Sequence, residues 1–349
     1  MDDRTTGRRR SMTPAEFSVL LSRRKLPSVL LFDGEDQHQK HAALADLRRA
    51  LLPEGLEDLN ETMLEDPDPD TLIAAAETLP FMADRRLIVV RDDPALVGRK
   101  EPEDRLLSYL PQAPASSVIL YFCVQNVDRK KKLFKAIEKL GGEVNFEPLK
   151  GAALTSFVVR AFHDLGRECP ERTADLLIFT SGSDTGVLLS EAAKIAAFHP
   201  ENPTVLPEDI EALATPSVEN RIFRLTDAVC AGQADRALSL LRNLQLNGER
   251  PEGITGILLR QLRLLQHVKI MQYEKRSTGD IQTALGLKNS YALQSFLRQA
   301  GAFSGRQVKE AVLLCLDTDL KAKSGQLNGK TALDALVLKL LLLREDGKT

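Results

Sequence analysis

The segment from Leu31 to His41 has the spacing of a phosphate-binding loop but only part of its chemistry. In the pattern G-x-x-x-x-G-K-[ST], backbone N–H groups cradle a phosphate, the lysine supplies charge and the final hydroxyl binds magnesium. Gly34 and Lys40 stand at the first glycine and the lysine, whereas Gln39 and His41 replace the second glycine and the hydroxyl. A side chain at Gln39 crowds the cradle, and imidazole is a poor ligand for magnesium. We therefore expect a nucleotide-binding strand and helix without ATP, with Lys40 on the helix surface.

The remaining candidates for catalysis are weak. Asp92 and Asp93 follow an apolar run, as a magnesium-binding acidic pair would, but Pro94 comes next and favours a turn that ends the strand. His38 and His41 share a helix face with no third ligand in view, so an exposed face is favoured over a metal site. We expect no catalytic residue, metal or cofactor. A divergent ATPase, resting on Gly34 and Lys40, stays open as the alternative.

Apolar runs alternate with helical stretches over the first 150 residues, which is typical of a parallel sheet covered by helices. The runs are unbroken, so strands buried on both faces are expected. Strands are predicted at residues 29–32, 86–90, 118–122 and 144–146, with a further candidate at 60–64. The fold class is thus α/β for this region.

Beyond Pro148 the pattern is almost entirely helical. Helices are predicted at residues 154–165, 185–198, 235–241, 254–273 and 331–343. A chain of 349 residues exceeds what one core usually supports, so several domains are expected. We predict a disordered tail over residues 1–15, an α/β domain over 16–149, a small helical domain over 150–215 and a larger helical domain over 216–349.

The composition excludes several classes of protein. Lys and Arg number 47 against 49 Asp and Glu, so no overall basic field attracts nucleic acid. The four cysteines are far apart, without zinc-site spacing, and fit a reducing cytoplasm. We find no apolar run long enough to span a membrane and no signal-peptide core at the start of the chain.

The most specific local feature is the run Leu79-Pro80-Phe81-Met82. Pro80 disfavours helix in the residues before it, so the segment is expected to be a turn or a helix end with one or two of these side chains exposed. An exposed aromatic residue and methionine on a rigid turn can form a wedge that binds a partner. The pattern alone leaves the wedge and an ordinary core packing equally open.

A basic run, Arg129-Lys130-Lys131-Lys132, precedes a predicted helix. Four cations at a helix N-terminus oppose the helix dipole. A solvated face is the commoner outcome for such a run. Contact with a nucleic-acid phosphate backbone is the sharper alternative, and it would make this a DNA-tethering module.

These motifs together resemble the delta subunit of the bacterial DNA polymerase III clamp loader, over nearly the whole chain. The segment from Thr78 to Val90, with Leu-Pro-Phe followed by Arg-Arg, is the most specific part. The other segments that carry the resemblance are residues 31–36, 128–136, 190–194 and 319–325.

The resemblance implies a RecA-like AAA+ domain that has lost ATP binding, a helical lid and a helical collar that joins a pentameric ring with delta-prime and gamma/tau subunits. By the same resemblance, Leu79, Phe81 and Met82 match the wedge that opens the beta sliding clamp for loading on primer-template DNA. The implied role is a non-catalytic accessory subunit of a DNA-directed DNA polymerase holoenzyme, a nucleotidyltransferase complex in the bacterial cytoplasm at the nucleoid-associated replisome. A divergent AAA+ ATPase acting on DNA is the alternative.

Overall fold

The computed structural model describes residues 11–198, 201–286 and 290–345. It divides the chain into two compact units, and the division falls between Pro148 and Leu149. Each unit is described by itself below. The expected boundary at residue 149 lies beside this division.

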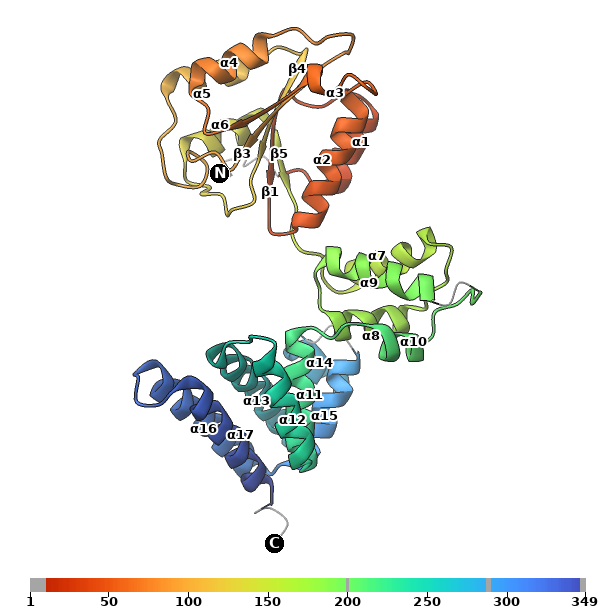
Figure 1. Cartoon of the computed structure of the whole chain (residues 1–349), viewed down its shortest axis with the longest axis vertical. Coiled ribbons are helices and arrows are strands. Elements are labelled where there is room, and N and C mark those ends of the chain that lie inside the picture. Colours follow the sequence, from red (N-terminus) through yellow and green to blue (C-terminus); the bar gives the residue numbers. More distant parts are fainter. Residues whose placement is uncertain (1–10, 199–200, 287–289, 346–349) are drawn as a thin grey trace, which may run out of the picture. The chain divides into compact units, whose positions relative to one another are not determined.

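The first unit is built on a five-stranded sheet with the order β2-β3-β4-β1-β5 (Figure 1). All neighbouring strands are parallel, with Leu31 of β1 opposite Tyr121 of β4 and Phe32 opposite Val144 of β5. The strands are β1 (Val29–Asp33), β2 (Glu61–Glu65), β3 (Arg86–Arg91), β4 (Ser117–Phe122) and β5 (Glu143–Asn145). The five predicted strands are therefore confirmed, including the further candidate at 60–64.

Helices cover both faces of this sheet, which explains why the central strands β1, β3 and β4 are apolar without alternation. The helices are α1 (Pro14–Ser22), α2 (Gln37–Leu51), α3 (Glu57–Asn60), α4 (Pro69–Glu77), α5 (Asp104–Tyr109), the 3₁₀ helix η1 (Leu110–Gln112) and α6 (Lys132–Leu140). Helices α1 and α2 pack on one face, where Phe17 and Leu47 meet Phe32 and Leu120. Helices α4, α5 and α6 cover the other face (Figure 1).

The disordered tail predicted over residues 1–15 is too long. The N–H of Met12 donates to the Glu143 carbonyl at 2.9 Å, and the Asn145 N–H donates to the Met12 carbonyl at 3.0 Å. The Thr13 side chain then caps α1 in a capping box with Glu16. Residues 11–15 therefore belong to the fold, because they extend the sheet edge beside β5 and start a helix. Residues 1–10 lie outside the described residues.

The second unit is helical and contains two hydrophobic cores. Helices α7 (Ala152–Asp164), α8 (Glu171–Ser181), α9 (Thr185–Phe198) and α10 (Pro207–Leu213) enclose the first core. The second core is formed by α11 (Val218–Ala231), α12 (Ala234–Leu246), α13 (Pro251–Tyr273), α14 (Thr278–Ala284), α15 (Ser290–Ala302), α16 (Gly305–Lys323) and α17 (Gly329–Glu345). All five predicted helices are confirmed. None of the helices within the described ranges combines the length and apolarity that crossing a membrane requires.

All four cysteines are free and buried. Burial raises the pKa of Cys169, Cys230 and Cys315 to about 12, because an apolar environment disfavours the thiolate. These thiols are packing residues of the helical unit.

Candidate functional site

The loop between β1 and α2, where a phosphate would bind, is closed by the chain that follows β5. The Phe146 N–H donates to the Asp33 carbonyl at 2.8 Å, and the Asp36 N–H donates to the Phe146 carbonyl at 3.0 Å. Gly34 has a φ of +109°, and a Cβ built on it would lie 2.4 Å from the Phe146 carbonyl oxygen. A glycine is therefore needed at position 34 because the Phe146 backbone lies so close to it, and not because a ligand binds there.

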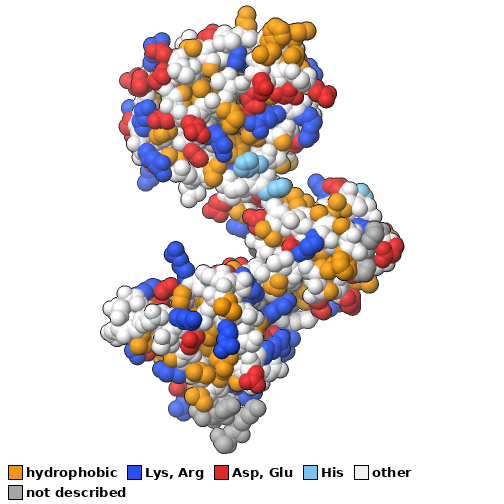
Figure 2. All heavy atoms as spheres, in the orientation of Figure 1, with side chains coloured by type: hydrophobic (Ala, Val, Ile, Leu, Met, Phe, Trp, Pro, Cys, Tyr) orange, Lys and Arg blue, Asp and Glu red, His pale blue; other side chains and the backbone are white. Residues whose placement is uncertain are grey.

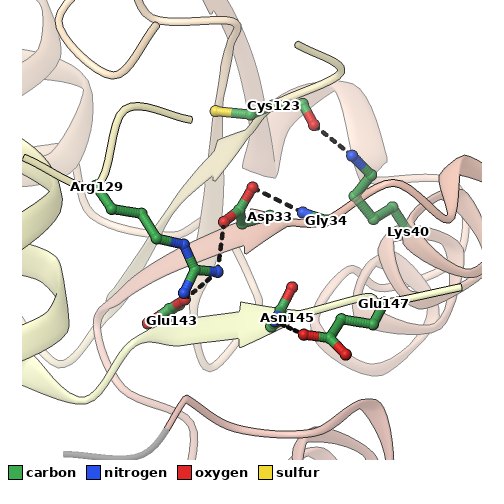
Figure 3. A network of polar contacts seen from close by, with 8 residues as sticks. All are labelled: Asp33, Gly34, Lys40, Cys123, Arg129, Glu143, Asn145 and Glu147. Atoms are coloured by element: carbon green, nitrogen blue, oxygen red, sulfur yellow. Dashed lines mark hydrogen bonds and ion pairs between the residues drawn. The ribbon is translucent and has the colours of Figure 1, made fainter. Parts of the chain in front are cut away.

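Carboxylates already occupy the N–H groups that a phosphate would need. The Gly34 N–H donates to Asp33 Oδ1 at 2.7 Å (Figure 3). Asp36 caps α2 and accepts from the Gln39 N–H at 2.9 Å and from Gln39 Nε2 at 2.7 Å. A helix N-terminus that holds a carboxylate repels a phosphate from the same place. Gln39 thus supports the cap, and Asp36 is a residue that the motif comparison missed, although Asp followed by Gln three residues later indicates a helix start.

Lys40 was wrongly expected on the helix surface. Its side chain is fully buried, and Nζ donates to the Cys123 carbonyl at 2.5 Å (Figure 3). Lys40 lies on the same helix face as Leu44 and Leu47, which pack into the core of this unit. The spacing of these residues in α2 was the signal that could have revealed the burial.

His41 and His38 do not form a metal site in the structure. His41 is exposed, its Nδ1 lies 2.8 Å from the Gln37 carbonyl, and its ring packs edge-on against Phe122. His38 is also exposed. No cluster of three metal-ligating side chains is found within the described residues.

Asp92 and Asp93 end β3 in a turn, as predicted. Asp92 has a φ of +42°, and its Oδ1 accepts from the N–H groups of Val124 and Gln125 at 2.8 and 3.0 Å. Asp93 is buried and accepts from the Ala95 N–H at 2.8 Å. Burial raises the pKa of the Asp93 carboxyl. Both carboxylates are thus engaged with the backbone of their own domain.

Two cations of the basic run are paired inside the first unit. Arg129 lies 3.0 Å from Asp33 and 3.1 Å from the buried Glu143 (Figure 3). Lys131 lies 2.6 Å from Glu101, and this ion pair raises the pKa of the lysine. The Lys130 side chain is exposed. The positive charge that the run can offer to a phosphate backbone is therefore smaller than its sequence suggests.

The segment of residues 79–82, here named the apolar turn, leaves all three of its large side chains exposed. Helix α4 ends at Glu77, immediately before it. Exposure is 77% for Leu79, 53% for Phe81 and 77% for Met82. Figure 2 shows hydrophobic side chains gathered at the edge of this unit, near the loop that follows α4. The core alternative is therefore wrong, and more of these residues are exposed than the sequence predicts.

Arginine residues hold the C-terminal end of the apolar turn against the sheet. Arg85 donates from its guanidinium to the carbonyls of Leu26 and Ser117 at 3.0 and 2.9 Å. Arg86 donates to Thr62 Oγ1 at 2.9 Å. The Arg-Arg pair that follows the turn in the sequence thus anchors it instead of contacting a partner.

The buried Lys40 predicts a pH dependence of stability. Burial lowers its pKa in the fold below the ordinary 10.5, so between these two values the unfolded chain binds more protons than the folded chain. The free energy of unfolding therefore rises with pH in this window, and the gain is lost as the pH falls through the folded pKa. We expect the wild type to gain stability relative to Lys40→Met as the pH rises toward 10.5, as measured by urea unfolding.

Lys25→Met is the matched control, because Lys25 is exposed. Its stability relative to wild type should stay nearly constant over the same range. If the free energies of unfolding of Lys40→Met and wild type change with pH in the same way, burial does not destabilise the ammonium of Lys40.

The order of the parallel sheet, the helices on both of its faces and the helical unit that follows define the class: an α/β domain with a helical region after it. Two family models then match the chain. The model described as DNA polymerase III, delta subunit matches residues 30–147, and the model for the C-terminal domain of the DNA polymerase III delta subunit matches residues 219–340. Together they cover more than half of the chain. The chain belongs to the family of DNA polymerase III delta subunits.

Individual relatives agree with this assignment. DNA polymerase III subunit delta of Bacillus subtilis is 24% identical over 322 residues, which cover 89% of this chain and 92% of the relative. The solved structure of the Bacillus subtilis DNA clamp loader delta protein has a TM-score of 0.54 at 22% identity, covering 94% of this chain and 99% of that one. At this identity the structural likeness shows a shared fold.

Proposed function

We propose that this chain binds and opens the beta sliding clamp within the DNA polymerase III clamp loader, without hydrolysing ATP itself. One observation carries the proposal: the apolar turn exposes Leu79, Phe81 and Met82 together on the surface of a well-packed domain. Large apolar side chains that are exposed side by side indicate a protein-binding surface.

The proposed mechanism uses binding energy to stabilise an open ring. A delta subunit shifts a closed clamp toward the open form only by the difference between its affinities for the two forms. Aromatic and methionine side chains supply such binding energy when they enter a pocket of the partner. The apolar turn is thus the clamp-binding element, and the rest of the first unit holds it in position.

The closed loop supports the proposal that other subunits of the complex carry the nucleotide chemistry. Asp33 and Asp36 take the N–H groups that would bind phosphate, so we place ATP in the neighbouring gamma/tau subunits of a ring that also contains delta-prime. The chain is then an accessory subunit with no catalytic residue of its own, active in the bacterial cytoplasm at the replisome. Any contact of the basic run with primer-template DNA we assign to Lys130 and Lys132, which are both exposed.

The two cores of the second unit support the division into lid and collar. We assign the lid to residues 150–215, which contain the smaller core, and the collar to residues 216–349. Helices α16 and α17 leave leucines exposed that their own core does not use, which fits a collar that packs against other subunits. These leucines are Leu313, Leu316, Leu320, Leu338 and Leu342.

The proposal is tested by mixing the chain with beta clamps that have been loaded on circular DNA. A protein that opens the clamp releases rings from circular DNA without ATP, because release requires only that the ring opens. Rings that stay on the DNA at a saturating concentration of the chain contradict the proposal.

The second candidate function, a divergent AAA+ ATPase acting on DNA, is favoured by Lys40, whose ammonium lies at the carboxyl edge of the sheet beside Cys123. That edge is where parallel sheets bind ligands. We expect no saturable binding of ATP with magnesium in equilibrium dialysis, because Asp33 and Asp36 occupy the loop. Saturable binding by the isolated chain would revive the ATPase.

A further inference from the structure

Asn60, the last residue of α3, is fully buried beneath the apolar turn. Its Oδ1 accepts from the Phe81 N–H at 2.8 Å, and its Nδ2 donates to the Phe81 carbonyl at 2.9 Å. Nδ2 also donates to the Leu56 carbonyl at 3.0 Å. One side-chain amide thus hydrogen-bonds both the N–H and the carbonyl of Phe81, as the backbone of a neighbouring strand would.

The chemistry of the partners fixes the orientation of this amide. Both neighbours of Nδ2 are carbonyl oxygens, and the neighbour of Oδ1 is an N–H group, so a flipped amide would place like groups together. In the part of the chain that the structure describes, Asn60 is the one side chain that hydrogen-bonds the backbone of residues 79–83. The side chains of the apolar turn cannot hold it in place, because they are exposed.

Local conformation makes such an anchor necessary. Met82 has a φ of +52°, a left-handed conformation that a non-glycine residue adopts only where its surroundings impose it. The Arg85 contacts hold the chain after the turn, and Arg86 also donates to the Thr78 carbonyl at 3.5 Å, so the arginines fix both ends of the turn but not its middle. Within residues 79–82, the side-chain hydrogen bonds of Asn60 to Phe81 are therefore what hold the backbone that carries the three exposed side chains.

We propose that Asn60 is a positioning residue for partner binding: it pre-organises the backbone of Phe81 so that Leu79, Phe81 and Met82 are presented as one rigid unit. The inference rests on the proposed clamp-binding function. Ordering a loop during binding costs affinity, and a loop that is already ordered avoids this cost. Asn60 therefore raises clamp affinity without touching the clamp.

The experiment compares Asn60→Ala with Asn220→Ala in the full chain. Asn220 is the matched control, because it is also a buried asparagine, only 4% exposed, and its Nδ2 donates to the Phe179 carbonyl at 3.0 Å in the helical unit. Both changes remove a buried amide, so both lower stability. We expect only Asn60→Ala to weaken binding to purified beta clamp, by about tenfold, at a temperature where both variants are folded.

Hydrogen exchange adds a readout in the free chain. Amide exchange of a peptide that contains Phe81, followed by mass spectrometry, should become faster in Asn60→Ala and stay unchanged in Asn220→Ala. If Asn60→Ala does not fold, Asn60→Ser replaces it, because serine keeps a small polar group without burying a charge and is too short to bond both backbone groups of Phe81. Its affinity should lie between those of wild type and a chain with a mobile turn.

The outcomes separate this inference from the proposed function. Equal clamp affinity of the Asn60 and Asn220 variants, while Phe81→Ala with Met82→Ala weakens binding, overturns the role of Asn60 alone. Unchanged affinity for the Phe81 and Met82 variant overturns the clamp-binding role of the turn, and the inference with it. Faster exchange and weaker binding confined to the Asn60 variant support both.

Discussion

Replacing Phe81 and Met82 together by alanine is expected to weaken binding to the sliding clamp by a hundredfold or more and to abolish ring release from circular DNA. Anchor residues that enter a partner's pocket typically contribute about 2 kcal/mol or more each, and about 1.4 kcal/mol corresponds to a factor of ten in affinity. Phe81 and Met82 are 53% and 77% exposed, so neither is committed to the fold. The loss should therefore appear in binding and not in stability.

Binding is best measured by titrating purified clamp, with thermal unfolding recorded for the same samples. The free energy of unfolding of the variant should differ from that of wild type by no more than about 0.5 kcal/mol, as is usual for surface substitutions. Leu246→Ala with Tyr273→Ala is the matched control, because Leu246 is 78% and Tyr273 89% exposed, and neither belongs to the apolar turn. Equal clamp affinity for the two double variants would contradict the assignment of the turn as the clamp-binding element.

Gly34→Ala is expected to destabilise the first unit by about 4 kcal/mol, a large part of the stability of a typical domain. The φ of +109° is unfavourable for alanine, which costs about 1–3 kcal/mol. The new Cβ would also lie 2.4 Å from the Phe146 carbonyl oxygen and 2.6 Å from its carbon, and such overpacking costs a further 1–3 kcal/mol or so. Relief would require β1 and the chain after β5 to separate.

Urea unfolding followed by far-UV circular dichroism measures this loss. Gly55→Ala is the matched control, because Gly55 has a φ of +79° and a Cβ added there would meet no neighbouring atom within 4 Å. It should show the conformational cost alone, about 1 kcal/mol. If Gly34→Ala is as stable as Gly55→Ala, the loop is not closed on Phe146, and closure of the loop does not exclude phosphate.

Local patterns in the sequence were sufficient for the five strands and for five of the helices in the helical unit. Unbroken apolar runs predict the parallel strands, because a strand covered on both faces has no polar side. Pro80 predicts the end of α4, because the residue before a proline avoids helical conformation. The replacements at Gln39 and His41 already argue against ATP on the chemistry of single side chains.

Which residues meet across the fold could not be predicted in the same way. Arg129 pairs with Asp33, the last residue of β1, and with Glu143, the first residue of β5, because pairing of these two parallel strands brings the carboxylates together. A run of four cations therefore has less free charge than its composition suggests. Lys40 is buried because its aliphatic stem shares a face with the core residues of α2, which a reading of the phosphate motif alone overlooked.

The sequence by itself determined the class of fold, the loss of the phosphate-loop residues and the presence of a proline-bounded apolar segment, since each depends on neighbouring residues. Only the tertiary structure decided whether Leu79, Phe81 and Met82 lie in the core or on the surface, because exposure depends on which elements pack over a turn. It also decided that Asn60, some twenty positions earlier in the chain, holds Phe81. Hydrogen bonds between residues so far apart exist only once the strands and helices between them have assembled.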